Sequence, residues 1–474
     1  MIDTQEIRKK ILSLALTGKL VEQNSSDTPA HQLVESLSGS LNNHPFENDI
    51  SAQEIPYEIP DSWVWCRLSD IGTTNIGLTY HPQDVAEDGT IVIRSSNIIK
   101  GKMDYADLVK VKCQIRENQY LKRNDIVICA RNGSKALVGK CAIYEGDSDV
   151  ISFGAFMAIF RTPFFQYAYL YFNSPVFRRN FSNDDSKQIN QVTQNILKNS
   201  LIPIPPEEEQ KRITDKINSV FSFLDTIDTL QSQYQENLVT LKSKIIDAGI
   251  QGKLTEQLPE DGTAEELYQR IQQEKLALEK AGKVKKSKPL PPISEEEKPF
   301  DIPDNWKWVR LIEVLNFIDY RGATPNKIGS GVPFVTAKNV RQGYIDYTIK
   351  EYISEEDYIN RQTRGISRKG DILFTTEAPM GYAAIADLEI FSAGQRLITF
   401  QQYTTDEYME NKYYMYYIAA RFFQKQLSEK CSGTTVKGIK ADRLKQFVVP
   451  LPSLAEQKRI VAKLEELLTL CEGK

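Results

Sequence analysis

The residues of this sequence that are best suited to chemistry are polar side chains on short loops, and their chemistry is recognition by hydrogen bonding. Arginine pairs bidentately with guanine, asparagine and glutamine pair with adenine, and glutamate accepts a hydrogen bond from cytosine. Lysine, serine and threonine hold phosphate oxygens. The candidates for contact with nucleic acid are Arg94, Ser96, Asn97, Arg131, Asn132, Ser134, Lys135, Lys187, Gln188, Arg321, Thr324, Lys338, Asn339, Glu377, Arg396, Thr434, Thr435 and Lys437.

No catalytic residue and no metal site are expected in this chain. The stretch from Gly133 to Cys141 resembles a phosphate loop, but five residues separate its glycines where four are required, and cysteine replaces the magnesium-binding serine or threonine. The three histidines lie in polar or linker settings, and the six cysteines include no Cys-x-x-Cys pair. An Asn/Asp-Pro-Pro-Tyr/Phe motif for amino-methyl transfer is also missing. The sequence therefore predicts a binding protein.

The candidate loops follow short β-runs that are interrupted by Gly, Asn and Asp. Residues 90–94 and 332–336 are predicted strands that lead into turns at Asn97 and Asn339. Residues 124–130 and 370–376 are predicted strands that end at the loops carrying Arg131 and Glu377. Each region is therefore expected to be an α+β domain whose loops project from a twisted sheet.

The chain contains two copies of one structural unit. Ile-Pro-Asp-Ser-Trp-Val-Trp at residues 59–65 returns as Ile-Pro-Asp-Asn-Trp-Lys-Trp at 302–308, and Glu-Gln-Lys-Arg-Ile at 209–213 returns at 456–460. A fixed period near half the chain length predicts a tandem repeat. The segments between these repeats differ far more than the repeats themselves, so we expect two similar frames with different binding loops. The recurring tryptophans fit a strand that packs each domain onto a helix.

A long helix separates the two domains. From Ile213 to Ala248, apolar residues recur at alternating steps of four and three, interrupted only by Gln231. This pattern is typical of a coiled coil or a long helical hairpin, and we expect it to act as a spacer and a partner-binding arm. The residues assigned to partner binding are Gln210, Arg212, Ile213, Leu238, Leu241, Gln457, Arg459 and Ile460.

A third repeat shows that the duplication is circularly cut. The segment Lys10-Ile-Leu…Gly18-Lys-Leu resembles Lys244-Ile-Ile…Gly252-Lys-Leu, so the N-terminal segment is expected to complete the arm that begins at the C-terminal helix. The expected fold is α+β, with two globular domains joined by long antiparallel coiled-coil helices in a pseudo-two-fold circular repeat. The expected divisions are an N-terminal helical segment (1–37), a linker (38–58), domain 1 (59–206), a central helical region (207–280), a linker (281–300), domain 2 (301–452) and a C-terminal helix (453–474).

Charge and composition limit the partners. The net charge is −4, but residues 59–200 hold 17 Lys and Arg against 14 Asp and Glu, and residues 302–447 hold 20 against 17. Domains this weakly basic need the charge of a partner protein to hold DNA tightly. The N-terminus lacks the plan of a signal peptide, and no apolar run could span a membrane. We expect a cytoplasmic protein without membrane partners.

Together these features resemble the specificity subunits of type I restriction–modification systems over essentially the full length. The resemblance rests on the paired Ile-Pro-Asp-x-Trp-x-Trp segments, the paired Pro-x-Pro…Glu-Gln-Lys-Arg-Ile helix starts and the Gly-Lys-Leu arm ends. It implies two target recognition domains, each reading one half of a split, asymmetric site in double-stranded DNA. It also implies helices that set the spacer and dock two methyltransferase subunits. S-adenosylmethionine, ATP and Mg would belong to those and to the restriction (motor) subunits, with no cofactor in this chain.

Two alternatives stay open at this point. One is a specificity subunit of a type II-like restriction system with a different catalytic partner. The other is a tandem-repeat scaffold that binds proteins through its arms and never contacts DNA. A self-contained methyltransferase is disfavoured because its motifs are missing.

Overall fold

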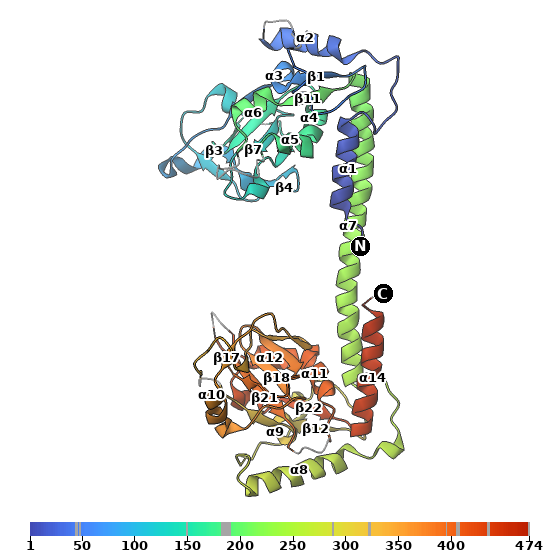
Figure 1. Cartoon of the computed structure of the whole chain (residues 1–474), viewed down its shortest axis with the longest axis vertical. Helices are drawn as coiled ribbons and strands as arrows, with labels where there is room; N and C mark the ends of the chain where they lie inside the picture. Colours follow the sequence, from blue (N-terminus) through green and yellow to red (C-terminus); the bar gives the residue numbers. More distant parts are fainter. Residues whose placement is uncertain are drawn as a thin grey trace. The chain divides into compact units, whose positions relative to one another are not determined.

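The computed structural model describes residues 1–42, 46, 49–147, 150–181, 191–286, 289–320, 324–394, 396–403, 408–433 and 437–472. The chain divides into two compact units, Met1–Ser232 (unit 1) and Gln233–Lys474 (unit 2). Each unit combines one globular domain with its own helical arm (Figure 1). The predicted class, α+β domains with long helices, is confirmed.

Unit 1 contains four small sheets. Their orders are β1-β11, β2-β10-β7-β8, β6-β3-β9 and β4-β5. Its strands are β1 (Val64–Arg67), β2 (Thr73–Ile76), β3 (Val85–Ile93), β4 (Ile98–Ile99), β5 (Lys102–Met103), β6 (Val109–Val111), β7 (Ile126–Cys129), β8 (Cys141–Ile143), β9 (Ile151–Phe153), β10 (Met157–Arg161) and β11 (Leu201–Ile204). Its helices are α1 (Thr4–Leu16), α2 (Ala30–Asn42), α3 (Leu68–Ile71), α4 (Phe165–Phe172), α5 (Pro175–Arg179), α6 (Gln194–Asn199) and the start of α7 (Glu207–Ile250).

Unit 2 repeats these sheets strand for strand, with the orders β12-β22, β13-β21-β18-β19, β17-β14-β20 and β15-β16. Its strands are β12 (Lys307–Arg310), β13 (Asn316–Ile318), β14 (Val332–Val335), β15 (Val340–Arg341), β16 (Tyr344–Ile345), β17 (Tyr352–Ile353), β18 (Ile372–Thr376), β19 (Met380–Ile385), β20 (Ser392–Ala393), β21 (Leu397–Gln401) and β22 (Val448–Leu451). Its helices are the end of α7, α8 (Ala264–Lys280), α9 (Leu311–Val314), α10 (Glu355–Asn360), α11 (Asn411–Ala419), α12 (Arg421–Lys430), α13 (Ala441–Leu444) and α14 (Leu454–Leu470).

The strand pairings confirm the predicted repeat. The tryptophan strand β1 pairs antiparallel with β11, and β12 pairs in the same way with β22. β3 and β14 each pair parallel with one neighbour, β9 and β20 respectively. The strands predicted around 90–94, 124–130, 332–336 and 370–376 appear as β3, β7, β14 and β18.

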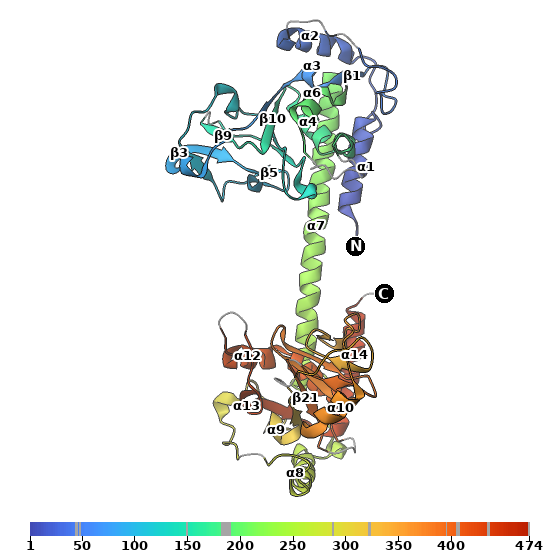
Figure 2. The same ribbon diagram turned by 60° about the vertical axis from the view of Figure 1, so that its left-hand side comes forward.

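The predicted arm helix is present as α7, which is 44 residues long. In unit 1, α1 runs antiparallel to it: the backbone amide of Ile2 donates to Gln231, and Arg8 pairs with Asp225 at 2.7 Å (Figure 2). In unit 2, α14 runs antiparallel to the other end of α7, where Lys242 pairs with Glu472 at 3.3 Å. The packing of residues 5–37 beside 453–472 joins segments of different units and stays a prediction.

A buried carboxylate joins the domain of unit 1 to its arm. Glu209, in the first turn of α7, is fully buried. It accepts hydrogen bonds from the indole of Trp63 at 2.9 Å and from the amide of Gln23 at 2.6 Å. Burial raises the pKa of Glu209, while these two donors lower it. Gly18 adopts a positive φ of 66° beside Pro60, where a Cβ atom would collide with the proline ring.

The same joint recurs in unit 2. Glu456, in the first turn of α14, is fully buried and accepts from the indole of Trp306 at 2.7 Å and from the amide of Gln257 at 2.5 Å. Gly252, with φ 72°, approaches Pro303 as Gly18 approaches Pro60. The three recurring motifs of the sequence therefore meet at one place in each unit.

The central sheets of the two units differ in the side chain that pairs with a buried aspartate. Asp125 in unit 1 receives two hydrogen bonds from Arg161, both of 2.6 Å. At the equivalent place in unit 2, Asp371 receives 2.7 Å hydrogen bonds from the neutral amide of Gln401 and from the backbone N–H of Arg368. Burial without a paired cation raises the pKa of Asp371 from 3.8 to about 7.

Trp63→Phe is expected to destabilise unit 1 by about 1–3 kcal/mol, because it leaves a buried oxygen of Glu209 without its donor. Trp65→Phe is the matched control: it removes the same ring volume, and the indole N–H of Trp65 has no hydrogen-bond partner among the described residues. Urea unfolding of the full chain measures both. Equal losses would show that ring volume, and not the hydrogen bond, stabilises the joint.

Asp371→Asn is expected to remove part of the pH dependence of stability. Because the folded pKa of Asp371 lies above its ordinary value, the folded state retains a proton that the unfolded state has released. Its contribution to stability is therefore full below about pH 4 and is lost as the pH rises through about 7. Relative to the parent, the variant should gain about 1–3 kcal/mol in unfolding free energy between pH 5 and pH 8. A pH-independent difference would contradict this.

Candidate nucleic-acid interface

Three segments of unit 1 meet where β7 ends and β10 begins. The backbone amides of Ala130 and Arg131 both donate to the carbonyl of Phe156, at 2.9 and 3.1 Å. The amide of Val192 donates to the carbonyl of Ala130 at 2.9 Å, and Arg131 forms a β-bridge with Gln191. Backbone hydrogen bonds therefore hold these three segments side by side.

This meeting point gathers several of the predicted side chains. Arg131 donates to the amide oxygen of Gln191 at 2.8 Å. Asn132 donates to the hydroxyl of Ser95 at 3.0 Å, and its side-chain oxygen accepts from the backbone of Ser134 at 2.9 Å. The loop 131–135 thus lies beside the turn 95–97. Ser96, Ser134 and Lys135 are exposed on the same pair of loops.

The prediction that Asn97 and Asn339 contact DNA is corrected by the structure. The two side chains are 1% and 2% exposed. The amide nitrogen of Asn97 donates to the carbonyls of Asp104 and Asp107, and that of Asn339 donates to two carbonyls in the equivalent turn. Their amide groups hold the turn that follows β3 or β14, so they do not present a free edge to a base.

Arg94 and Lys338 lie beside these turns and are partly neutralised. Arg94 pairs with Asp107 at 2.8 Å, and Lys338 pairs with Glu351 at 3.3 Å. Both side chains remain accessible enough to reach a phosphate, and neither belongs to the meeting point of the three segments.

Unit 2 has the same meeting point with different side chains. The backbone amide of Thr376 donates to the carbonyl of Arg396 at 2.8 Å, and Glu377 forms a β-bridge with Gly438. Arg396 and Glu377 form an ion pair at 3.3 Å, with both side chains exposed. Lys437, also exposed, precedes the bridge. Thr324 is exposed on the loop that follows β13.

Five of the predicted contacts lie outside the described residues: Lys187, Gln188, Arg321, Thr434 and Thr435. Sequence reasoning missed Phe156 and Gln191, which belong to the unit 1 meeting point. Aligning the two repeats on the glycines at 154 and 394 places Phe156 opposite Arg396. This alignment could have identified Phe156 from the sequence, because Arg396 was already a candidate.

Four of the eight residues assigned to partner binding are buried within their own unit, and these assignments are corrected. Ile213 and Ile460 are fully buried in the cores, and the side chains of Gln210 and Gln457 donate to backbone carbonyls. The motif Glu-Gln-Lys-Arg-Ile therefore builds the joint. Arg212 and Arg459 form ion pairs with Asp27 and Asp261 respectively but remain partly exposed, so their assignment to partner binding stays a prediction.

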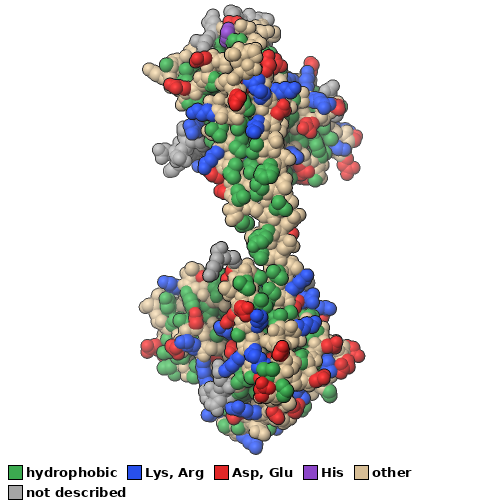
Figure 3. Space-filling model, turned by 90° about the vertical axis from the view of Figure 1, so that its right-hand side faces the viewer, with side chains coloured by type: hydrophobic (Ala, Val, Ile, Leu, Met, Phe, Trp, Pro, Cys, Tyr) green, Lys and Arg blue, Asp and Glu red, His purple; other side chains and the backbone are tan. Residues whose placement is uncertain are grey.

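Leu238 is partly buried and Leu241 is 47% exposed, so these two remain available on α7. They lie near other exposed apolar residues of the helix, including Tyr234 and Val239. Figure 3 shows hydrophobic side chains on the helical part of the chain.

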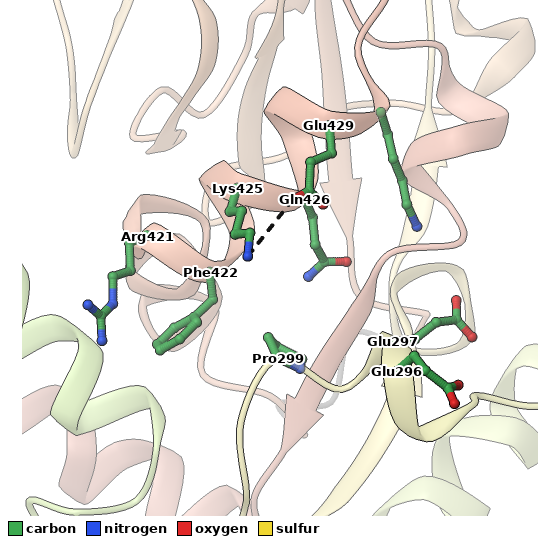
Figure 4. Close-up of a pocket in the computed structure, with 9 residues that line it drawn as sticks. Glu296, Glu297, Pro299, Arg421, Phe422, Lys425, Gln426 and Glu429 are labelled. Atoms are coloured by element: carbon green, nitrogen blue, oxygen red, sulfur yellow. Dashed lines mark ion pairs between the residues drawn. The ribbon is translucent and has the colours of Figure 1, made fainter.

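A cleft of about 550 Å³ lies in unit 2 between α12 and the segment 296–299. In Figure 4, Lys425 points toward Glu429 on the same helix, and their ion pair measures 4.0 Å. Arg421 pairs with Asp247 at 2.6 Å. Arg421, Lys425 and Glu429 of the lining are therefore already paired.

Two other features are absent from the described part of the chain. No group of three or more His, Cys, Asp or Glu residues there could hold a metal ion. No described helix is both long and apolar enough to cross a membrane.

Comparison with known proteins identifies the fold and the family. The family described as type I restriction modification DNA specificity domain matches residues 60–235 and 303–473. The chain is 28% identical to the type I restriction enzyme EcoAI specificity subunit of Escherichia coli, over 98% of this chain and 89% of that protein. It is 25% identical to the EcoEI specificity subunit of the same species, over 99% and 89%.

Two solved structures share the fold. One comes from a study of complex assembly and conformational transition of the type I R-M system, with a TM-score of 0.62, 21% identity, and coverage of 88% of this chain and 93% of that one. The other is the HsdS subunit from Thermoanaerobacter tengcongensis, with a TM-score of 0.51, 21% identity, and coverage of 88% and 92%. Since the family match covers both repeats, this chain belongs to the type I restriction–modification DNA specificity family.

Proposed function

We propose that this chain is the sequence-specific DNA-binding subunit of a type I restriction–modification complex, and that each domain reads one half of a bipartite, asymmetric site. The observation that carries this proposal is the pair of meeting points. The same backbone frame presents Arg131 and Gln191 in one unit, and Glu377 and Arg396 in the other. Different hydrogen-bonding groups on equivalent frames suit two different half-sites.

The chemistry of the complex would belong to partner subunits. The described residues contain no metal-ligand cluster, and the expected partners are two methyltransferase subunits and restriction (motor) subunits. S-adenosylmethionine would bind to the former, and ATP with Mg to the latter. The modest positive charge of the two domains fits a chain that holds DNA together with such partners.

We place methyltransferase docking on the exposed apolar side of α7. In unit 2, the described part of α14 pairs with α7 only as far as Lys242, so Tyr234 is left 58% exposed and Leu241 47% exposed, about two helical turns apart on one face. Large exposed apolar patches mark protein interfaces. A continuous helix also suits the role of setting the unread spacer between half-sites. A scaffold that never contacts DNA is disfavoured by the family match.

The deciding experiment maps methylated adenine across the host genome with the gene intact and deleted. Loss of N6-methyladenine from one split motif is expected, and that motif would reveal both half-sites. An unchanged methylome in a host that expresses the methyltransferase partner would refute the proposed function.

Arg131→Ala is expected to relax one position of one half-site, and Arg396→Ala one position of the other. Losing a bidentate contact to a base costs about 1–3 kcal/mol of discrimination. Lys135→Ala is the control, because an exposed lysine on the same loop should hold phosphate and weaken specific and random DNA alike. Competition binding with the assembled complex measures all three. If Arg131→Ala weakens both kinds of DNA equally, Arg131 contacts the backbone and does not read a base.

The double variant Tyr234→Asp/Leu241→Asp is expected to reduce co-purification with the methyltransferase subunit at least tenfold, since it places charge on an apolar interface. The unfolding free energy should change little, because both side chains are exposed. Ser243→Asp, an exposed polar position on the same helix, is the matched control. Undiminished co-purification of the double variant would place the docking surface elsewhere.

A further inference from the structure

Phe156 stands out among the apolar residues of the unit 1 domain. Its side chain is 60% exposed on the loop between β9 and β10. Because the ring is exposed, it buries little apolar surface in the folded chain, and covering it with a ligand would be favourable. The backbone of the same residue is firmly held, because its carbonyl accepts from the amides of Ala130 and Arg131.

Comparison of the two units shows that this position holds an exposed side chain on a fixed backbone. Gly154 donates its backbone N–H to the carbonyl of Ile93 at 2.9 Å, and Gly394 donates to that of Val335 at 3.0 Å. Two residues later stands Phe156 in unit 1 and Arg396 in unit 2, each immediately before an equivalent strand. The frame therefore holds the backbone fixed while the exposed side chain changes from an aromatic ring to a guanidinium group.

The neighbours of Phe156 indicate what the ring would meet. The backbones of Arg131 and Phe156 are hydrogen-bonded, and the guanidinium group of Arg131 is steadied by Gln191. An arginine placed to read a base edge requires a paired, stacked duplex in front of it. On the edge of such a duplex, the apolar group open to a side chain in the major groove is the 5-methyl group of thymine.

We propose that Phe156 is a specificity-determining residue of domain 1, whose ring contacts the methyl group of a thymine in the half-site that unit 1 reads. The contacted A·T pair lies next to the base pair that Arg131 reads. This inference rests on the proposed function and adds an apolar contact to a set of hydrogen-bonding residues.

The test uses the full chain assembled with its methyltransferase subunits, and duplexes that carry the motif found by methylation mapping. Each thymine is replaced in turn by deoxyuridine, which lacks only the methyl group. One replacement in one half-site is expected to weaken binding by the parent about fourfold, the value of one buried methyl group. Phe156→Ala should weaken binding to the unmodified duplex at least as much and show no further loss with that deoxyuridine.

Val85→Ala is the control, since Val85 is another exposed apolar residue of the same domain, at the start of β3. It should bind like the parent and keep the parent's sensitivity to deoxyuridine. Binding of random duplex should be unchanged for both variants. Because the ring is exposed, unfolding of Phe156→Ala should match the parent.

Three results would overturn this inference while leaving the proposed function intact. In the first, the parent binds the split motif and Phe156→Ala binds equally well. In the second, the variant retains the parent's full sensitivity to every deoxyuridine. In the third, the half-site of unit 1 contains no A·T pair beside the position that Arg131→Ala relaxes. By contrast, a parent complex that binds no split motif would overturn the proposed function itself.

Discussion

A buried carboxylate in the first turn of an arm helix holds each half of this molecule together. Glu209 and Glu456 each accept from a tryptophan of the domain and from a glutamine that follows the helical arm, so one side chain ties three segments far apart in sequence. Its cost is the desolvation of a carboxylate, which is offset only while both donors are in place. The tryptophan strand, the glycine turn and the helix start must therefore persist together, whatever the loops do.

That dependence explains which parts of the fold could be predicted from the sequence. The joint requires particular residue types at several places, so its motifs recur and reveal the duplication, the strands and the long helix. The same recurrence misled the assignment of partner surfaces. Ile213 and Ile460 recur because each fills a core. The proposed docking surface on α7 has no motif that recurs in the sequence. Exposure along α7, seen at Leu241, could be read only from the packed structure.

The candidate interface was predicted in part. Arg131 and Glu377 follow predicted strands directly, so their place at a strand end could be inferred from local pattern alone. Asn97 also follows a predicted strand, but its side-chain amide donates to the carbonyls of Asp104 and Asp107. The sequence does not reveal that these hydrogen bonds close the turn. Phe156 was overlooked because an aromatic residue before a strand is ordinarily core. Its exposure depends on how three separate segments meet.

Because the joint and the strand ends lie in different parts of each unit, residues at the strand ends can change without disturbing the joint. At the strand ends, the backbone makes the structural hydrogen bonds and the side chains project outward, so exchanging phenylalanine for arginine leaves the frame intact. Deeper in the sheet, the exchange of Arg161 for Gln401 is not neutral, since it leaves Asp371 with a raised pKa. Changes in recognition can therefore accumulate at the rim without loss of stability, whereas changes beneath it carry a cost that depends on pH.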